Sequence, residues 1–118
     1  TDYGEHWQGP YINPMSIGNS KIFAGELSNG KKYLIYNEDR GYFKRTLLVI
    51  AVADRHSGRY DRVYKILEGE CAELGRGSIW FYPCAFEAEG FLYVACTLQE
   101  DDDVRSAIIS KIPVDSLR

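Results

Sequence analysis

The sequence predicts an all-β protein of about seven strands arranged mostly in antiparallel hairpins, and three observations support this. Tyrosine and phenylalanine are abundant, with nine and five residues, and aromatic side chains favour strands. Short apolar runs alternate with turn signals along the chain, and no stretch shows a sustained helical period. The length of 118 residues is that of one domain with a real core.

The first half of the chain predicts four consecutive strands. The run KIFAGEL at 21–27 is followed by a hairpin turn with Asn29-Gly30 at its tip, and KKYLIYN at 31–37 then runs back. The near-continuous apolar run RTLLVIAVA at 45–53 indicates a strand that is buried on both faces. After a polar turn, YDRVYKIL at 60–67 completes the set.

The second half predicts three more strands. WFYPCAFEA at 80–88 reaches a tight turn at Glu89-Gly90 and returns as FLYVACTL at 91–98. The last strand is VRSAIISKIPV at 104–114. A group of four strands followed by three favours four-stranded propeller blades, with 20–67 as one blade and 80–114 as an incomplete last one. A small β-sandwich or barrel is the alternative on this pattern.

Composition excludes several classes of partner and site. The net charge of −3 leaves no basic patch, so we expect no nucleic-acid partner. No apolar run reaches about 18 residues, so we expect no membrane span. Three cysteines without a C-x-x-C pair predict buried thiols rather than a zinc site or a disulfide framework. The acidic run Glu100 to Asp103 is typical of a solvated hairpin tip, so we expect no metal and no cofactor.

The opening TDYGEHW predicts a tight turn before any strand. The carboxylate of Asp2 can bond the amides of its own turn, Gly4 can adopt positive φ, and Trp7 can fold beneath them. A strand should arrive before such a turn, and here it would lie before residue 1. We therefore expect residues 1–14 to be the end of a preceding blade and the chain to be a piece of something larger.

The chain resembles the sialidase-type β-propeller family. DYGEHW is similar to that family's Asp-box, Ser/Thr-x-Asp-x-Gly-x-Thr-Trp, with Asp2, Gly4 and Trp7 on its Asp, Gly and Trp. Four further segments resemble the family's last two blades in the same order: NSKIFAGELSNGKKYLIYN, KRTLLVIAV, WFYPCAFEAEGFLYVACT and SAIISKIPVDSL. The resemblance covers nearly the whole chain and implies two blades of a propeller, the second one incomplete.

The resemblance also implies specific site residues. Sialidases hold a substrate carboxylate with three arginines and attack the sugar with a tyrosine that a glutamate activates. Arg45 falls at the third arginine, with Arg40 as a rival, and Tyr82 falls at the catalytic tyrosine. Trp80 is a candidate for stacking on a sugar ring or for the core. Pro83 stands where the family usually has serine, and it should hold Tyr82 extended.

Two function classes follow from these residues. The chain is expected to be the C-terminal fragment of a sialidase-like glycoside hydrolase, inactive alone because the glutamate, the acid/base aspartate and two arginines belong to earlier blades. The alternative is a stand-alone, non-catalytic β protein that binds a ligand or partner, with carbohydrate as the expected ligand. In either case an unpaired edge at 104–114 and an open apolar face at LLVIAV predict a homo-oligomer, either a three-copy ring or a dimer.

Overall fold

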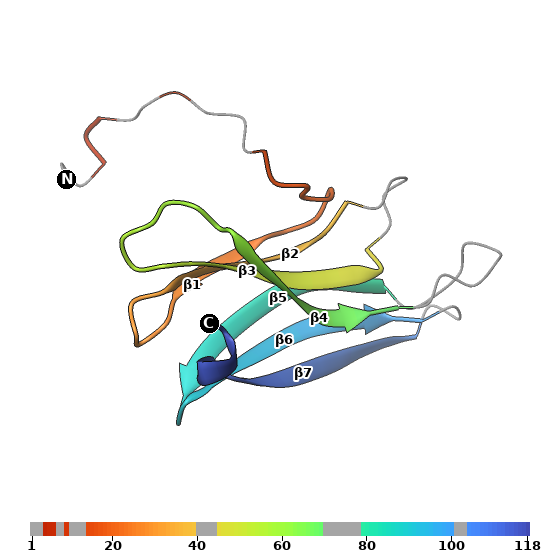
Figure 1. The fold of residues 1–118 in the computed structure, drawn as a ribbon. Helices are drawn as coiled ribbons and strands as arrows, with labels where there is room; N and C mark the ends of the chain where they lie inside the picture. The colour runs from red at the N-terminus through yellow and green to blue at the C-terminus, as the bar shows by residue number, and fades with distance from the viewer. Residues whose placement is uncertain (1–3, 7–8, 10–13, 40–44, 70–78, 101–103) are drawn as a thin grey trace.

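The computed structural model describes residues 4–6, 9, 14–39, 45–69, 79–100 and 104–118. It confirms the all-β class, with seven strands in two antiparallel sheets and one short 3-10 helix, η1. Figure 1 shows the two sheets as two layers, with the four-stranded sheet lying over the three-stranded one. The elements are β1 (Phe23–Glu26), β2 (Lys32–Asn37), β3 (Leu47–Ala53), β4 (Arg62–Glu68), β5 (Ile79–Ala88), β6 (Phe91–Gln99), β7 (Arg105–Pro113) and η1 (Val114–Ser116).

The four-stranded sheet is a meander in the order β1-β2-β3-β4. The predicted turn between β1 and β2 is present, with Gly30 at φ 83° and its amide donating to the Leu27 carbonyl at 2.8 Å. All seven residues of β3 are buried, as the continuous apolar run predicts. The strand has a paired neighbour on each side and covered faces above and below, so it is the centre of the fold.

The three-stranded sheet follows the order β5-β6-β7. The predicted tight turn between β5 and β6 is confirmed, since Glu89 and Gly90 both have positive φ, at 51° and 78°. This combination matches the twist of a two-residue hairpin. Along β6 the even-numbered residues Leu92, Val94 and Cys96 are buried, and the odd-numbered ones face the other side of the sheet.

The main core lies between the two sheets. Its centre is an inner cluster of apolar side chains from both layers, and β5 contacts β1, β2 and β3 across the interface. The cluster consists of Leu27, Tyr33, Ile35, Leu48, Ile50, Val52, Leu92, Val94, Cys96, Val114 and Leu117. Burial raises the pKa of the Tyr33 phenol and of the Cys96 thiol above their ordinary values. Cys96 is the buried thiol that the sequence predicts, but Cys84 is exposed, so that prediction is wrong for Cys84.

A second cluster covers the opposite face of β3. Tyr36, Leu47, Val49 and Ala51 are buried there, and Met15, Ile17, Leu34 and Tyr60 pack against them. The expectation of an open apolar face at LLVIAV is therefore wrong. The chain covers this face with its own residues, including the segment before β1, where Ile17 forms a bridge with Glu38.

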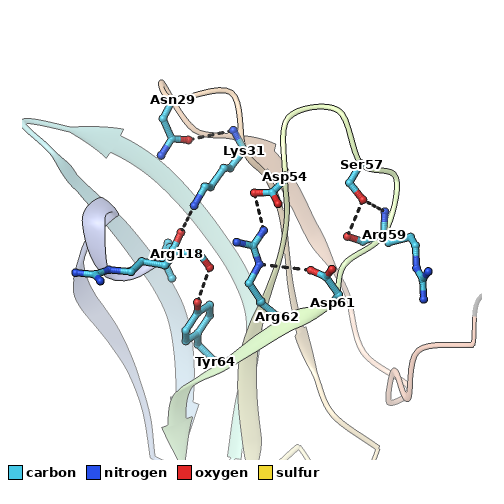
Figure 2. Close-up of polar contacts among 10 residues, drawn as sticks. Asn29, Lys31, Asp54, Ser57, Arg59, Asp61, Arg62, Tyr64 and Arg118 are labelled. Atoms are coloured by element: carbon cyan, nitrogen blue, oxygen red, sulfur yellow. Dashed lines mark hydrogen bonds and ion pairs between the residues drawn. The ribbon is translucent and has the colours of Figure 1, made fainter.

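The last residues are fastened to the four-stranded sheet by polar contacts, which Figure 2 shows. The Lys31 ammonium donates to the Leu117 carbonyl at 3.0 Å, and the Tyr64 hydroxyl donates to the Arg118 carbonyl at 2.8 Å. Beside them Arg62 pairs with Asp54 at 2.8 Å, and this hydrogen bond lowers the pKa of the Asp54 carboxyl. The first two contacts join the residues after η1 to the turn before β2 and to β4.

The architecture is compatible with two of the three expected arrangements. The barrel is wrong, because the strand order of each sheet is open over the described residues. Two antiparallel sheets packed face to face occur both in a two-layer sandwich and in adjacent propeller blades. The choice of a propeller therefore belongs to the proposal below.

Candidate functional site

A bulge in β5 gives the strand an uncommon backbone conformation. Phe81 pairs with Thr97 and Cys84 pairs with Ala95, so two residues, Tyr82 and Pro83, lie opposite one residue of β6. Proline has no amide hydrogen to donate, and bulges are where a strand tolerates it. Tyr82 has φ 56°, and the residue is 56% exposed. The expectation of an extended Tyr82 is wrong, because the extra residue of the bulge takes the left-handed conformation here.

The strand pairing around the bulge holds Tyr82 in the left-handed conformation, which raises the free energy of the folded state. Tyrosine rarely has positive φ, and the strain of such a residue is about 1–2 kcal/mol. Strain of this kind is found more often at functional sites than elsewhere. The bulge therefore holds Tyr82 in a backbone conformation that tyrosine disfavours, which makes it a candidate site residue.

Phe81, next to this strained residue, is the centre of a cationic and aromatic cluster. Phe81 is 6% exposed, and the Tyr82 ring meets its ring edge-on at 5.0 Å between centroids. The guanidinium of Arg45 lies 5.7 Å from the Phe81 centroid, and that of Arg105 lies 6.0 Å from it. Guanidinium groups are attracted to aromatic faces, and this ring has two of them near it, one from the segment before β3 and one from β7.

Backbone contacts fix the position of Arg45. Its carbonyl accepts a hydrogen bond from the Trp80 amide at 2.9 Å, which joins the start of β3 to the start of β5. Its guanidinium donates to the Asn19 carbonyl at 3.1 Å. The arginine is thus held at its backbone and at its guanidinium, whose central carbon lies 5.7 Å from the Phe81 centroid.

Asn37 supports the same junction from inside the protein. The residue is fully buried, and its amide nitrogen donates to the Trp80 carbonyl at 2.9 Å and to the Leu47 carbonyl at 3.3 Å. Its side chain links β2 and β3 to β5 directly beside Arg45. Neither the polarity pattern nor the turn signals of the sequence point to this residue.

The structure brings together some of the predicted site residues and not others. Arg45 and Tyr82 contact the same Phe81 ring, while their roles stay predictions. Trp80 packs against the inner cluster, on the opposite side of β5 from its neighbour Phe81. Gly4 has the positive φ that the expected turn needs, at 86°. Asp2, Trp7 and the rival Arg40 lie outside the described residues.

Arg105 is the member of the cluster that sequence reasoning missed. It is the first residue of β7 and pairs with Gln99, which in turn pairs with Ile79. Its approach to Phe81 depends on the registers of two hairpins. No local motif signals this approach, and only the correct alignment of all three strands could have found it.

The described residues contain no group of three side chains suited to holding a metal ion. Within the same part of the chain, no helix is long and apolar enough to cross a membrane. Comparison with family models, with curated protein sequences and with solved structures finds no match for this chain.

The strain at Tyr82 can be tested with two substitutions that both remove the ring. Tyr82→Val should unfold at lower urea than Tyr82→Asn, with a difference of about 1–2 kcal/mol, because asparagine tolerates the left-handed conformation and valine does not. Urea unfolding followed by tryptophan fluorescence measures the difference. Equal stability of the two variants would mean that Tyr82 does not keep positive φ in solution.

Proposed function

We propose that the chain is a binding module for acidic carbohydrate, built from two sheets of a sialidase-type propeller, and that alone it does not hydrolyse its ligand. The observation that carries the proposal is the pair of guanidiniums, from Arg45 and Arg105, on one aromatic ring. A guanidinium fork matches a carboxylate bidentately and stays charged at every relevant pH. The exposed Tyr82 adds an aromatic surface and a hydroxyl beside them.

The proposal that the chain alone does not hydrolyse its ligand is based on the resemblance to sialidases and not on the fold. The residues of this chain that match the sialidase pattern are Arg45 and Tyr82, and a catalytic group that acts as a unit loses nearly all activity when members are missing. A larger protein that supplied the activating glutamate, the acid/base aspartate and two more arginines would be a sialidase-like hydrolase. The four-stranded meander beside a three-stranded sheet supports this origin.

A titration tests the proposed function. N-acetylneuraminate and glucuronate should both bind, uncharged galactose should not, and Arg45→Ala should weaken binding of the acids at least about tenfold, since a hydrogen bond to a charged group contributes about 1.5–3 kcal/mol. Arg59→Ala, which removes an exposed arginine from the loop before β4, is the matched control. A fluorogenic sialoside should release no dye. Unchanged binding in Arg45→Ala would refute the proposed site, and dye release would refute the non-hydrolytic proposal.

Self-association through β7 is part of the same proposal. The expectation of an oligomer is based on an open apolar face on β3 and on an unpaired edge strand. The face of β3 is covered, but β7 is an edge strand of nine residues. Unpaired strand edges recruit further strands, so we expect a dimer that pairs two copies of β7. Light scattering at micromolar concentration should give twice the chain mass of 13.5 kDa, and a single-chain mass would contradict the dimer.

A further inference from the structure

The outward face of the three-stranded sheet is aromatic, apolar and exposed. Alternation turns Leu92, Val94 and Cys96 toward the inner cluster, so their neighbours along β6 point the other way. We name this side the outer face and define it by Phe81, Phe86, Phe91, Tyr93, Arg105, Ile109 and Lys111. Phe86 is 62% exposed and Ile109 is 66% exposed, which is unusual for side chains of this size.

The rings of the outer face form a ladder across the strands. Phe86 of β5 stacks on Tyr93 of β6 with 5.1 Å between centroids and 12° between planes. The ammonium of Lys111 on β7 lies 5.8 Å from the Tyr93 centroid and 3.9 Å from that of Phe91. The far end of this face holds the Phe81 cluster with Arg105.

The charges on the outer face have one sign. Arg105 and Lys111 are its ionised residues, and none of its described strand positions carries an aspartate or glutamate. The chain as a whole has a net charge of −3, so this face is positively charged although the protein is acidic. The two cations lie on one strand, roughly 20 Å apart along it, with apolar surface between them.

We propose that the outer face binds an acidic oligosaccharide that runs from the Arg45–Arg105 site to Lys111. This rests on the proposed function and extends it from a single acidic sugar to a chain. Widely spaced carboxylates with neutral sugars between them match two separated cations with an apolar, aromatic surface in the middle. Aromatic side chains present flat apolar surface to the C–H faces of sugar rings, and Phe86 has such a surface exposed.

Two other occupants fit the face less well. Single-stranded nucleic acid carries a phosphate at every nucleotide and is bound along a positively charged groove, whereas the two cations of this face are separated by apolar surface. A second copy docking face to face would bring like cations toward one another, which costs binding energy. Charge complementarity therefore favours an acidic glycan.

Calorimetric titration tests this proposal with oligosaccharides of alternating glucuronate and N-acetylglucosamine. The hexasaccharide should bind about tenfold tighter than the disaccharide, because it adds one stacking and one charged contact. Phe86→Ala and Lys111→Gln should each remove most of that gain and leave disaccharide affinity unchanged. Val63→Ala and Lys32→Gln, exposed positions on the other sheet, are matched controls and should keep the gain. Urea midpoints near that of the wild type establish that each variant is folded.

The outcomes separate this inference from the proposed function. Disaccharide binding with no gain for the hexasaccharide, or a gain that survives both Phe86→Ala and Lys111→Gln, overturns the outer-face proposal and leaves the acid site intact. Hexasaccharide binding that depends on Phe86 without any disaccharide binding supports the outer face and overturns the acid site. If a single-stranded RNA oligomer binds more tightly than the hexasaccharide and its binding depends on Lys111, the glycan proposal is overturned. A dimer that Phe86→Ala dissociates also overturns the glycan proposal, because a second copy would then occupy the outer face.

Discussion

Replacing Asn37 with leucine should lower the free energy of unfolding by about 2–4 kcal/mol, the largest effect expected of any substitution considered for this protein. The leucine side chain has a similar volume, so the change removes hydrogen bonds rather than creating a cavity. It takes from the Trp80 carbonyl the donor that lies 2.9 Å away in the wild type, and from the Leu47 carbonyl a second donor at 3.3 Å, while Leu47 keeps the Glu38 amide at 3.2 Å. A buried polar group without a partner costs its full desolvation energy.

Urea unfolding measures the effect, and Asn19→Leu is the control. Asn19 has an exposed side chain, and its contact with Arg45 uses the backbone carbonyl, which the substitution keeps. The control should change stability by less than about 0.5 kcal/mol. A loss in Asn37→Leu no larger than in the control would show that the buried amide does not join the two sheets.

Gly25→Ala should destabilise the protein by about 1–3 kcal/mol, against the ordinary rule that alanine is better than glycine in a strand. Gly25 lies directly opposite Tyr33 in the β1–β2 ladder, and the Tyr33 ring covers the position where a β-carbon would stand. Tyr33 is buried in the inner cluster, so its ring has little room to move aside. An added methyl group must displace either the ring or the strand.

A double-mutant cycle isolates this clash. In a Tyr33→Val background the penalty of Gly25→Ala should nearly disappear, which gives a coupling energy of similar size to the penalty itself. Gly58→Ala is the control, because a β-carbon there meets no atom within 4 Å, and it should be neutral or slightly stabilising. A penalty that persists without the Tyr33 ring would place its cause in the backbone of β1.

The strands could be predicted because their signals are local. The continuous apolar run of β3 and the turn residues Asn29-Gly30 and Glu89-Gly90 each determine structure within a few residues, and all three are found as expected. The run predicts burial on both faces of β3, but it does not show what covers them, since the cover of one face depends on the chain before β1 returning over the sheet.

The candidate site was predicted only in part for the same reason. Arg45 and Tyr82 were chosen by a family resemblance, but the cluster around Phe81 depends on strand register. The bulge at Tyr82 and Pro83 shifts the β5–β6 ladder, and Arg105 reaches Phe81 through two hairpins. Asn37 is a polar residue at the end of an apolar strand, and its link between the two sheets arises only when β5 packs against it.

The connectivity of the two sheets has a consequence for how the chain folds. Every ladder joins strands that are neighbours in the sequence, as the orders β1-β2-β3-β4 and β5-β6-β7 show. Each hairpin therefore closes a short loop at little entropic cost, and β structure with such local contacts forms faster than sheets of distant strands. The contact from Asn37 to Trp80 spans 43 residues and belongs to the docking of one preformed sheet on the other. We therefore expect the meeting of the two meanders to be the slow step of folding, with Arg45 reaching Phe81 only then, whereas Arg105 reaches Phe81 as the three-stranded sheet forms.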